Sequence, residues 1–154
     1  MPEYGLLDAS SGRGLLPWSW AEERLSASHN YWVATARPEG RPHVMPVWGV
    51  WLDGAFYFST AQGSRKIRNL AGNPQCVVST ERADEAVIVE GEAARVGSAG
   101  LPAAFKQTYD QKYDWDIDAD QEGFYAVRPR VAFGFIEHAD QFRGSATRWR
   151  FPDA

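Results

Sequence analysis

The chain has 154 residues, of which 44% are hydrophobic and 23% charged, and these values predict one globular domain, residues 1–154, with its own core. Its 16 basic and 20 acidic residues give a net charge of −4, which argues against nucleic-acid binding because that function needs a basic face. No apolar run approaches the roughly 18 residues of a membrane span, and the N-terminus lacks the basic-then-apolar order of a signal peptide. The single cysteine, Cys76, is typical of a reducing compartment, so we expect a cytoplasmic protein.

The first half of the chain predicts an arm, a helix and a run of strands. Residues 1–16 contain a Ser/Gly-rich stretch and are expected to form a flexible or draped arm. A helix is predicted over residues 17–25, with Ser19 as N-cap and Glu22 three residues later, as in a capping box. Strands are predicted over residues 30–37, 42–52 and 55–60, the last two joined by a hairpin turn at Asp53-Gly54.

The second half adds two helices and further strands. A helix over residues 64–71 ends at Gly72-Asn73-Pro74, and strands follow over 75–81 and 86–96. A helix over residues 101–113 carries Phe105, Tyr109 and Tyr113 on one side, which is typical of core or interface packing. An acidic loop, 114–121, precedes strands over 124–128 and 131–137 and a possible last strand over 146–151. About seven strands joined mainly by hairpins, with short inserted helices, predict an antiparallel closed or nearly closed barrel.

The segment 56–70 carries the most informative functional signal. It predicts a strand, a glycine turn and a helix that opens with Ser64, Arg65 and Lys66. The start of a helix has N–H groups without intrahelical partners and a partial positive charge, so two cations and a hydroxyl at that point suit a phosphate. The alternative is an ordinary helix capped by Ser64 with a solvated basic face. The local spacing leaves both interpretations open.

The predicted strand over residues 42–52 contains Pro46, which removes a ladder hydrogen bond and requires an edge, a bulge or a bound group at that point. A planar heterocycle lying against the strand could use the neighbouring free backbone groups. Trp48 and Trp51 flank this place, on opposite faces of a regular strand. The alternative is an edge strand with two packed indoles.

The sequence contains few other signals of a catalytic site. His29, His43 and His138 lack metal-ligand spacing, and Cys76 has no obvious base. The aspartates of the acidic loop do not follow the calcium-loop pattern, so we expect a solvated loop. The chain has no Walker or Rossmann glycine loop. An enzyme of this kind would take its chemistry from a cofactor.

Five motifs together resemble the pyridoxamine 5'-phosphate oxidase-like split β-barrel superfamily, and within it the B-type flavin/deazaflavin oxidoreductases of actinobacteria. They are GRPHVMPVWGVW (40–51), FYFST (56–60), GSRKIRNLAGNP (63–74), VIVEGEA (87–93) and ATRWRF (146–151). The resemblance runs from Trp18 to Phe151. It implies a mainly β, antiparallel split barrel and a homodimer with two cofactor sites, each built from both subunits.

The resemblance also implies roles for residues of this chain. The ring of the cofactor would be lined, mostly through backbone, by His43, Val44, Met45, Pro46, Val47 and Trp48. The ribityl-phosphate end would lie near Ser59 and Thr60, and the phosphate at the helix start formed by Ser64, Arg65 and Lys66. The partner subunit would close the site near Val87, Ile88, Val89 and Trp149.

The function implied is that of an oxidoreductase in which coenzyme F420 delivers hydride to a small unsaturated or conjugated substrate, with no side chain obligatory for the transfer. FMN is the alternative cofactor, and a flavin- or deazaflavin-binding protein without turnover is the alternative function. Pyridoxamine phosphate oxidases proper have a basic side chain where Trp48 stands, and Arg148-Trp149-Arg150 only partly matches their substrate-phosphate set. Oxidation of pyridoxamine phosphate is therefore not expected.

Overall fold

The computed structural model describes residues 7–10, 15–121, 123–137 and 145–152, so His138 lies outside the described residues. Within them, no helix is long and apolar enough to cross a membrane. The elements in chain order are β1 (Leu7–Asp8), α1 (Trp18–Ala27), β2 (Tyr31–Ala36), β3 (Pro42–Val47), β4 (Gly49–Leu52), β5 (Ala55–Ser59), α2 (Arg65–Gly72), β6 (Gln75–Thr80), β7 (Glu85–Val96), the short 3-10 helix η1 (Ser98–Gly100), α3 (Phe105–Tyr113), β8 (Phe124–Ile136) and β9 (Thr147–Arg150).

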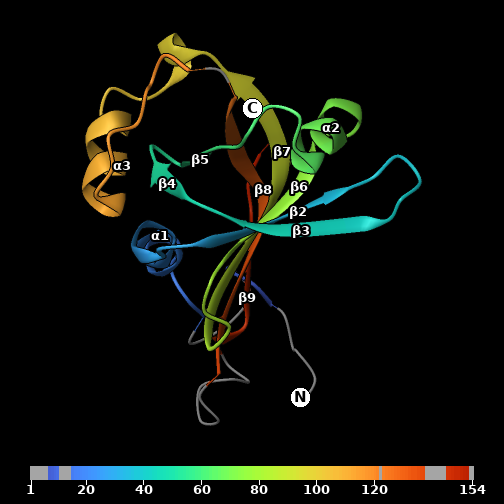
Figure 1. The fold of residues 1–154 in the computed structure, drawn as a ribbon. Coiled ribbons are helices and arrows are strands. Elements are labelled where there is room, and N and C mark those ends of the chain that lie inside the picture. The colour runs from blue at the N-terminus through green and yellow to red at the C-terminus, as the bar shows by residue number, and fades with distance from the viewer. Residues whose placement is uncertain (1–6, 11–14, 122, 138–144, 153–154) are drawn as a thin grey trace.

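The strands form one branched, mainly antiparallel sheet (Figure 1). Its main path runs β1-β9-β8-β7-β6-β2-β3, and β4 joins through β5, which pairs with β8. The branch arises because β5 pairs with the first part of β8 and β9 with the second part, while β7 follows β8 along nearly its whole length. The arrangement of strands and three short helices confirms the predicted mainly β fold and is consistent with a split barrel.

The strand β8 is continuous, and the prediction of two strands over residues 124–128 and 131–137 was wrong. Pro129 does not end it, because Pro129 lies opposite Gly91 where the register with β7 shifts. The next pair is Glu90 with Val131, so Arg130 is the extra residue of a bulge. A Cβ on Gly91 would lie 2.3 Å from the carbonyl oxygen of Arg128, so the bulge also requires a glycine there.

The predicted strand over residues 42–52 is divided at Trp48. Its first part, β3, pairs with β2, whereas its second part, β4, pairs with β5. Trp48 therefore stands where the chain leaves one part of the sheet for another. The predicted turn at Asp53-Gly54 is confirmed, since both residues have the positive φ that a tight β-hairpin needs (50° and 76°).

The helix α1 forms as predicted but without the predicted capping box. Pro17 is its N-cap, no side chain of the described residues caps it, and Ser19 lies inside the first turn. Proline suits this end because its missing N–H would have no partner in the helix. Glu22 instead accepts a hydrogen bond from Trp51 Nε1 at 3.2 Å.

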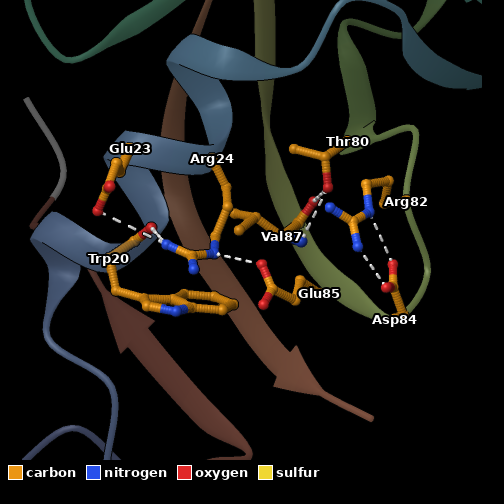
Figure 2. Close-up of polar contacts among 8 residues, drawn as sticks. All are labelled: Trp20, Glu23, Arg24, Thr80, Arg82, Asp84, Glu85 and Val87. Carbon is orange, nitrogen blue, oxygen red and sulfur yellow. Dashed lines mark hydrogen bonds and ion pairs between the residues drawn. The ribbon is translucent and has the colours of Figure 1, made fainter.

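Arg24 fastens α1 to the start of β7 (Figure 2). Its Nε donates to Glu85 Oε2 at 3.1 Å, its Nη1 donates to the Trp20 carbonyl at 3.1 Å, and its guanidinium lies 4.1 Å from the centre of the Trp20 ring. Val87 is anchored nearby, because its N–H donates to Thr80 Oγ1 at 3.1 Å. The contacts of Arg24 therefore hold α1 against the start of β7.

Two apolar clusters lie around the β4–β5–β8 part of the sheet. The main core includes the fully buried Phe56 and Phe58, which alternate along β5 with Tyr57 of the second cluster. The helix α3 covers this second cluster, and its predicted stripe of Phe105, Tyr109 and Tyr113 is buried. The stripe is therefore core packing.

The segment predicted as an arm contains β1, which pairs in parallel with β9. Asp8 accepts a hydrogen bond from Arg148 Nε at 2.7 Å, and the Leu16 N–H donates to Thr147 Oγ1 at 3.0 Å. The described part of this segment is thus draped along the last strand.

Candidate cofactor site

The start of α2 is built as the sequence predicts. Ser64 is the N-cap, and its hydroxyl oxygen accepts from the Ile67 N–H at 3.3 Å. Thr60 Oγ1 donates to the same oxygen at 3.2 Å, which places the end of β5, with Ser59 and Thr60, beside the helix. The N–H groups of Arg65 and Lys66 have no intrahelical carbonyl to bond, and both are available to an anion.

Lys66, at the start of α2, is a lysine in an unusually buried position. The residue is only 8% exposed, yet neither Lys66 nor Arg65 has a hydrogen-bond or ion-pair partner among the described residues. Burial lowers the pKa of Lys66, because an ammonium group loses hydration there without a compensating charge. A partly desolvated cation without a partner is unfavourable, and an anionic ligand would offset that cost.

Two further side chains come from the hairpin of β2 and β3. His43 lies opposite Thr35 in the register, and Arg37 follows two residues after Thr35 on the same side of the chain. His43 Nδ1 and Arg37 Nε are both buried and have no hydrogen-bond partner among the described residues. Burial first, and then the positive charges of Lys66, Arg37 and Arg65, hold the pKa of His43 below its ordinary value.

These four side chains, Arg37, His43, Arg65 and Lys66, are called here the cationic cluster. Asn69 lies one turn after Arg65 on α2: its Nδ2 donates to Thr35 Oγ1 at 2.9 Å, while its Oδ1 is buried without a hydrogen-bond partner among the described residues. Among the described residues, Arg65 and Lys66 have no acidic partner, and Arg37 interacts only with the carboxylate of Glu39. Three cations and an imidazole gathered in this way in a chain of net charge −4 fit a phosphate group. The donor set therefore meets the requirement of a phosphorylated cofactor.

The strand β3 beside the cluster is an exposed apolar edge. It pairs only with β2 among the described strands, so the edge interpretation of Pro46 is confirmed. Val44 is 54% exposed, Met45 44% and Trp48 39%. His43, Met45 and Val47 alternate along β3 with Val44 and Pro46, which face the other side of the sheet with Trp32. A flat ligand on this edge would contact one set of side chains and the backbone.

The remaining residues that the resemblance implies lie elsewhere in this chain. Val87 and Val89 have no exposed surface, and Trp149 is 6% exposed in the main core against Trp18. Ile88 lies on the opposite sheet face from Val87 and Val89, opposite Phe133 of β8. One chain does not bring these side chains together with the cationic cluster, so a role for them depends on a partner subunit.

Sequence reasoning missed Arg37 and Asn69. The signal for Arg37 was available, since a hairpin with its turn at residues 38–41 places Thr35 and Arg37 on the face of His43. Asn69 lies one turn after Arg65 on α2, the spacing that brings two side chains onto the same side of a helix. Neither residue belongs to a motif of its own, which is why the pattern alone did not single it out.

Comparisons with known proteins agree with the fold. Residues 20–132 match the sequence profile described as pyridoxamine 5'-phosphate oxidase. A solved structure named F420 reductase is 25% identical, with a TM-score of 0.57 over 72% of this chain and 94% of that one. Two proteins from Mycobacterium smegmatis share the fold: an FAD-binding protein (18% identity, TM-score 0.55, 88% and 98% covered) and a haem-binding protein (20%, 0.60, 80% and 56%). No curated protein sequence gives a significant match.

Proposed function

The chain belongs to the pyridoxamine 5'-phosphate oxidase family, and on that premise we propose that it is an oxidoreductase that binds coenzyme F420 and delivers hydride to a small unsaturated or conjugated substrate. The carrying observation is the cationic cluster, in which Lys66, a residue of 8% exposure, has no ion-pair partner among the described residues. A phosphate placed among Arg37, His43, Arg65 and Lys66 would receive charged hydrogen bonds and neutralise the partly desolvated ammonium group of Lys66.

The ring of the cofactor would lie along β3, between the cluster and Trp48. Pro46 offers no N–H on this edge, and the exposed Val44, Met45 and Trp48 supply an apolar surface for a planar system. The bound deazaflavin would supply the hydride chemistry. The protein would hold the phosphate, orient the ring and exclude water, so no side chain of its own is assigned a proton or hydride step.

F420 is preferred over FMN because Trp48 stands where a basic side chain is expected in pyridoxamine phosphate oxidases, and because a protein named F420 reductase shares the fold at 25% identity. FMN remains the alternative, since the cationic cluster would bind the phosphate of either cofactor. A protein that binds a flavin or deazaflavin without turnover is the alternative function.

We further propose a cytoplasmic homodimer with two shared cofactor sites. The sheet face opposite the core, called here the outer sheet face, carries Trp32, Val44, Pro46, Val77 and Ile88 in neighbouring register positions. Trp32 is 44% exposed there, and its partner in the register, Pro46, is also exposed. A second copy on this face would cover apolar surface and bring its own residues towards β3.

The proposal is tested by titrating the purified protein with F420 and, separately, with FMN, while following tryptophan fluorescence. The chain has seven tryptophans, and Trp48 lies next to the proposed ring site, so a bound chromophore should quench the emission. F420 should bind more tightly than FMN. Reduced F420 is then incubated with a panel of conjugated alkenes, and its oxidation is followed by absorbance.

Each outcome separates the alternatives. Tight FMN binding with none for F420 would replace the cofactor but keep the site. Binding of F420 without turnover of any substrate in the panel would support a carrier. Binding of neither cofactor would refute the proposed function.

A further inference from the structure

The junction between β3 and β4 is held by side chains of α3, which lies beside β4 (Figure 1). The N–H of Gly49 donates to Tyr113 Oη at 2.8 Å. The same hydroxyl lies 2.7 Å from the Gly49 carbonyl oxygen and 2.8 Å from the His29 carbonyl oxygen, either of which accepts its proton. One phenol therefore binds the N–H of the residue that follows Trp48 and donates its own proton to the carbonyl of that residue or to that of His29.

Lys112, the neighbour of Tyr113 on α3, holds the same glycine. Its Nζ donates to the Gly49 carbonyl at 3.1 Å, to Tyr31 Oη at 2.6 Å and to the Ser26 carbonyl at 3.5 Å. The three protons of the ammonium group thus have three oxygen acceptors, which come from β4, β2 and α1. The junction is tied to three elements through one side chain.

The ring of Trp48 rests on Tyr113. The two ring centres are 4.5 Å apart and their planes differ by 10°, so Tyr113 covers one face of the indole. Trp115 meets Trp48 edge-on at 6.1 Å, and His29 does so at 6.2 Å. Trp48 remains 39% exposed, so its orientation is set by α3 and the following loop while part of the ring stays open to a ligand.

We propose that Tyr113 and Lys112 are positioning residues, which fix the backbone of Gly49 and the ring of Trp48 and thereby set the wall against which the cofactor ring lies. The cofactor half of this inference rests on the proposed function, whereas the orientation of Trp48 does not. The proposal gives α3, the helix between β7 and β8, a role in the site. Neither the apolar stripe of this helix nor its distance in sequence from Trp48 indicates that role.

The contrast with Tyr109 separates this role from core packing. Tyr109 lies one turn earlier on the same stripe and is 5% exposed, close to the 7% of Tyr113. Its hydroxyl makes no hydrogen bond with a described residue, whereas that of Tyr113 contacts Gly49 and His29. Tyr109→Phe is therefore a matched control for Tyr113→Phe, since both variants keep the ring and lose one hydroxyl.

The test combines two measurements on the full chain. The first follows the indole N–H signals of the protein without cofactor by 1H–15N NMR, with the Trp48 signal assigned from Trp48→Phe. The Trp48 signal should move in Tyr113→Phe and in Lys112→Met. In Tyr109→Phe, the Trp48 signal and the remaining indole signals should all stay in place.

The second measurement is F420 affinity, which should fall about tenfold in Tyr113→Phe. This is the loss expected when one well-placed hydrogen bond is removed and the wall becomes less ordered.

An unmoved Trp48 signal in a folded Tyr113→Phe or Lys112→Met variant overturns the inference, and Lys112→Met decides alone if the tyrosine variant does not fold. A moved signal with unchanged F420 affinity overturns the cofactor half. If the unmodified protein binds neither F420 nor FMN, the proposed function fails, and the NMR measurement alone decides whether Tyr113 and Lys112 orient Trp48.

Discussion

Asn69 of α2 donates a hydrogen bond of 2.9 Å to the hydroxyl of Thr35 on β2, and both residues are buried. This contact joins the helix that carries Arg65 and Lys66 to the strand whose hairpin carries Arg37 and His43. Because the contact is buried, it holds the two elements that carry the four side chains of the cationic cluster beside each other without a ligand. The backbone of the cluster is therefore in place before binding, which lowers the cost of binding a phosphate.

The first prediction concerns the start of α2. Replacing Arg65 and Lys66 together by alanine should weaken cofactor binding by a hundredfold or more, since charged hydrogen bonds contribute roughly 1.5–3 kcal/mol each. The stability of the variant without cofactor should change little, because neither cation has a hydrogen-bond or ion-pair partner among the described residues to lose. Fluorescence titration and urea unfolding measure the two effects.

Arg68→Ala is the matched control, since Arg68 is exposed on the same helix. It should bind the cofactor as the unmodified protein does. Equal affinity in the double variant would leave α2 as an ordinary capped helix with a solvated basic face.

The second prediction concerns Arg37, which the sequence did not single out. Its Nε is buried without a partner among the described residues, so it should donate to the bound phosphate. Arg37→Ala should reduce cofactor affinity by about tenfold to a hundredfold. Arg41→Ala on the same hairpin is the control, because Arg41 is exposed and pairs with Glu39 at 3.2 Å. A loss of the same size in both variants would mean that only the general charge of the hairpin matters.

The third prediction is that cofactor binding takes up protons through His43. Burial and the charges of Lys66, Arg37 and Arg65 keep the pKa of His43 low in the free protein. A bound phosphate offsets those charges and raises this pKa, so binding should strengthen as the pH falls towards the ordinary histidine value of about 6.5. Calorimetric titration in two buffers of different ionisation enthalpy measures the uptake. The uptake should be smaller in His43→Asn, and an unchanged value would remove His43 from the site.

The fourth prediction concerns stability at alkaline pH. Burial lowers the pKa of Lys112 to about 8, although Glu81 acts in the opposite direction. The unfolded chain keeps this proton up to the ordinary lysine value of about 10.5, so between pH 8 and that value it binds more protons than the folded chain. The free energy of unfolding, relative to Lys112→Met, should therefore rise with pH in this window, by up to about 3 kcal/mol.

Urea unfolding of the two proteins at a series of pH values from 7 to about 10 measures this difference. The comparison with Lys112→Met subtracts groups that titrate in both proteins. A difference that stays flat or falls across the window would contradict a lowered pKa for Lys112.

The fifth prediction concerns Gly49. A Cβ at this position would lie 2.3 Å from Phe56 Cζ and 2.7 Å from the Tyr57 carbonyl oxygen, which is backbone and cannot move aside. Gly49→Ala should therefore destabilise the protein by about 1–3 kcal/mol or more. Gly72→Ala is the control, because a Cβ there meets nothing within 4 Å. Thermal unfolding of the two variants should differ clearly, and equal melting temperatures would mean that β4 and β5 can separate at low cost.

Local signals in the sequence predicted much of the fold. The cap of α2 by Ser64, the turn at Asp53-Gly54 and the aromatic stripe of α3 each depend on residues within one or two turns of chain, and each is present. The failures have non-local causes. The break at Trp48 arises because β3 and β4 have different partner strands, which a continuous apolar run does not reveal.

Non-local contacts also explain the wrong prediction for the strand β8 and the residues of the site that the sequence did not reveal. Pro129 would end a strand on local grounds, but the bulge opposite Gly91 accommodates it. The start of α2 and the exposed β3 edge were predictable from residue types and a proline. Arg37 and the anchoring of Gly49 by Tyr113 depend on which elements lie side by side, and hence on the three-dimensional structure.

The branching of the sheet at β8 also affects the order in which the chain can fold during synthesis. The hairpin of β4 and β5 connects to the rest of the sheet only through β8, among the described strands. β8 begins at Phe124, so most of the chain has left the ribosome before that hairpin finds its second neighbour. Until then, the two rows of side chains on β5 have no β8 strand beside them, and the nascent chain exposes apolar surface. Closure of the barrel is therefore a late event, and nascent chains that stop before β8 should be prone to aggregation.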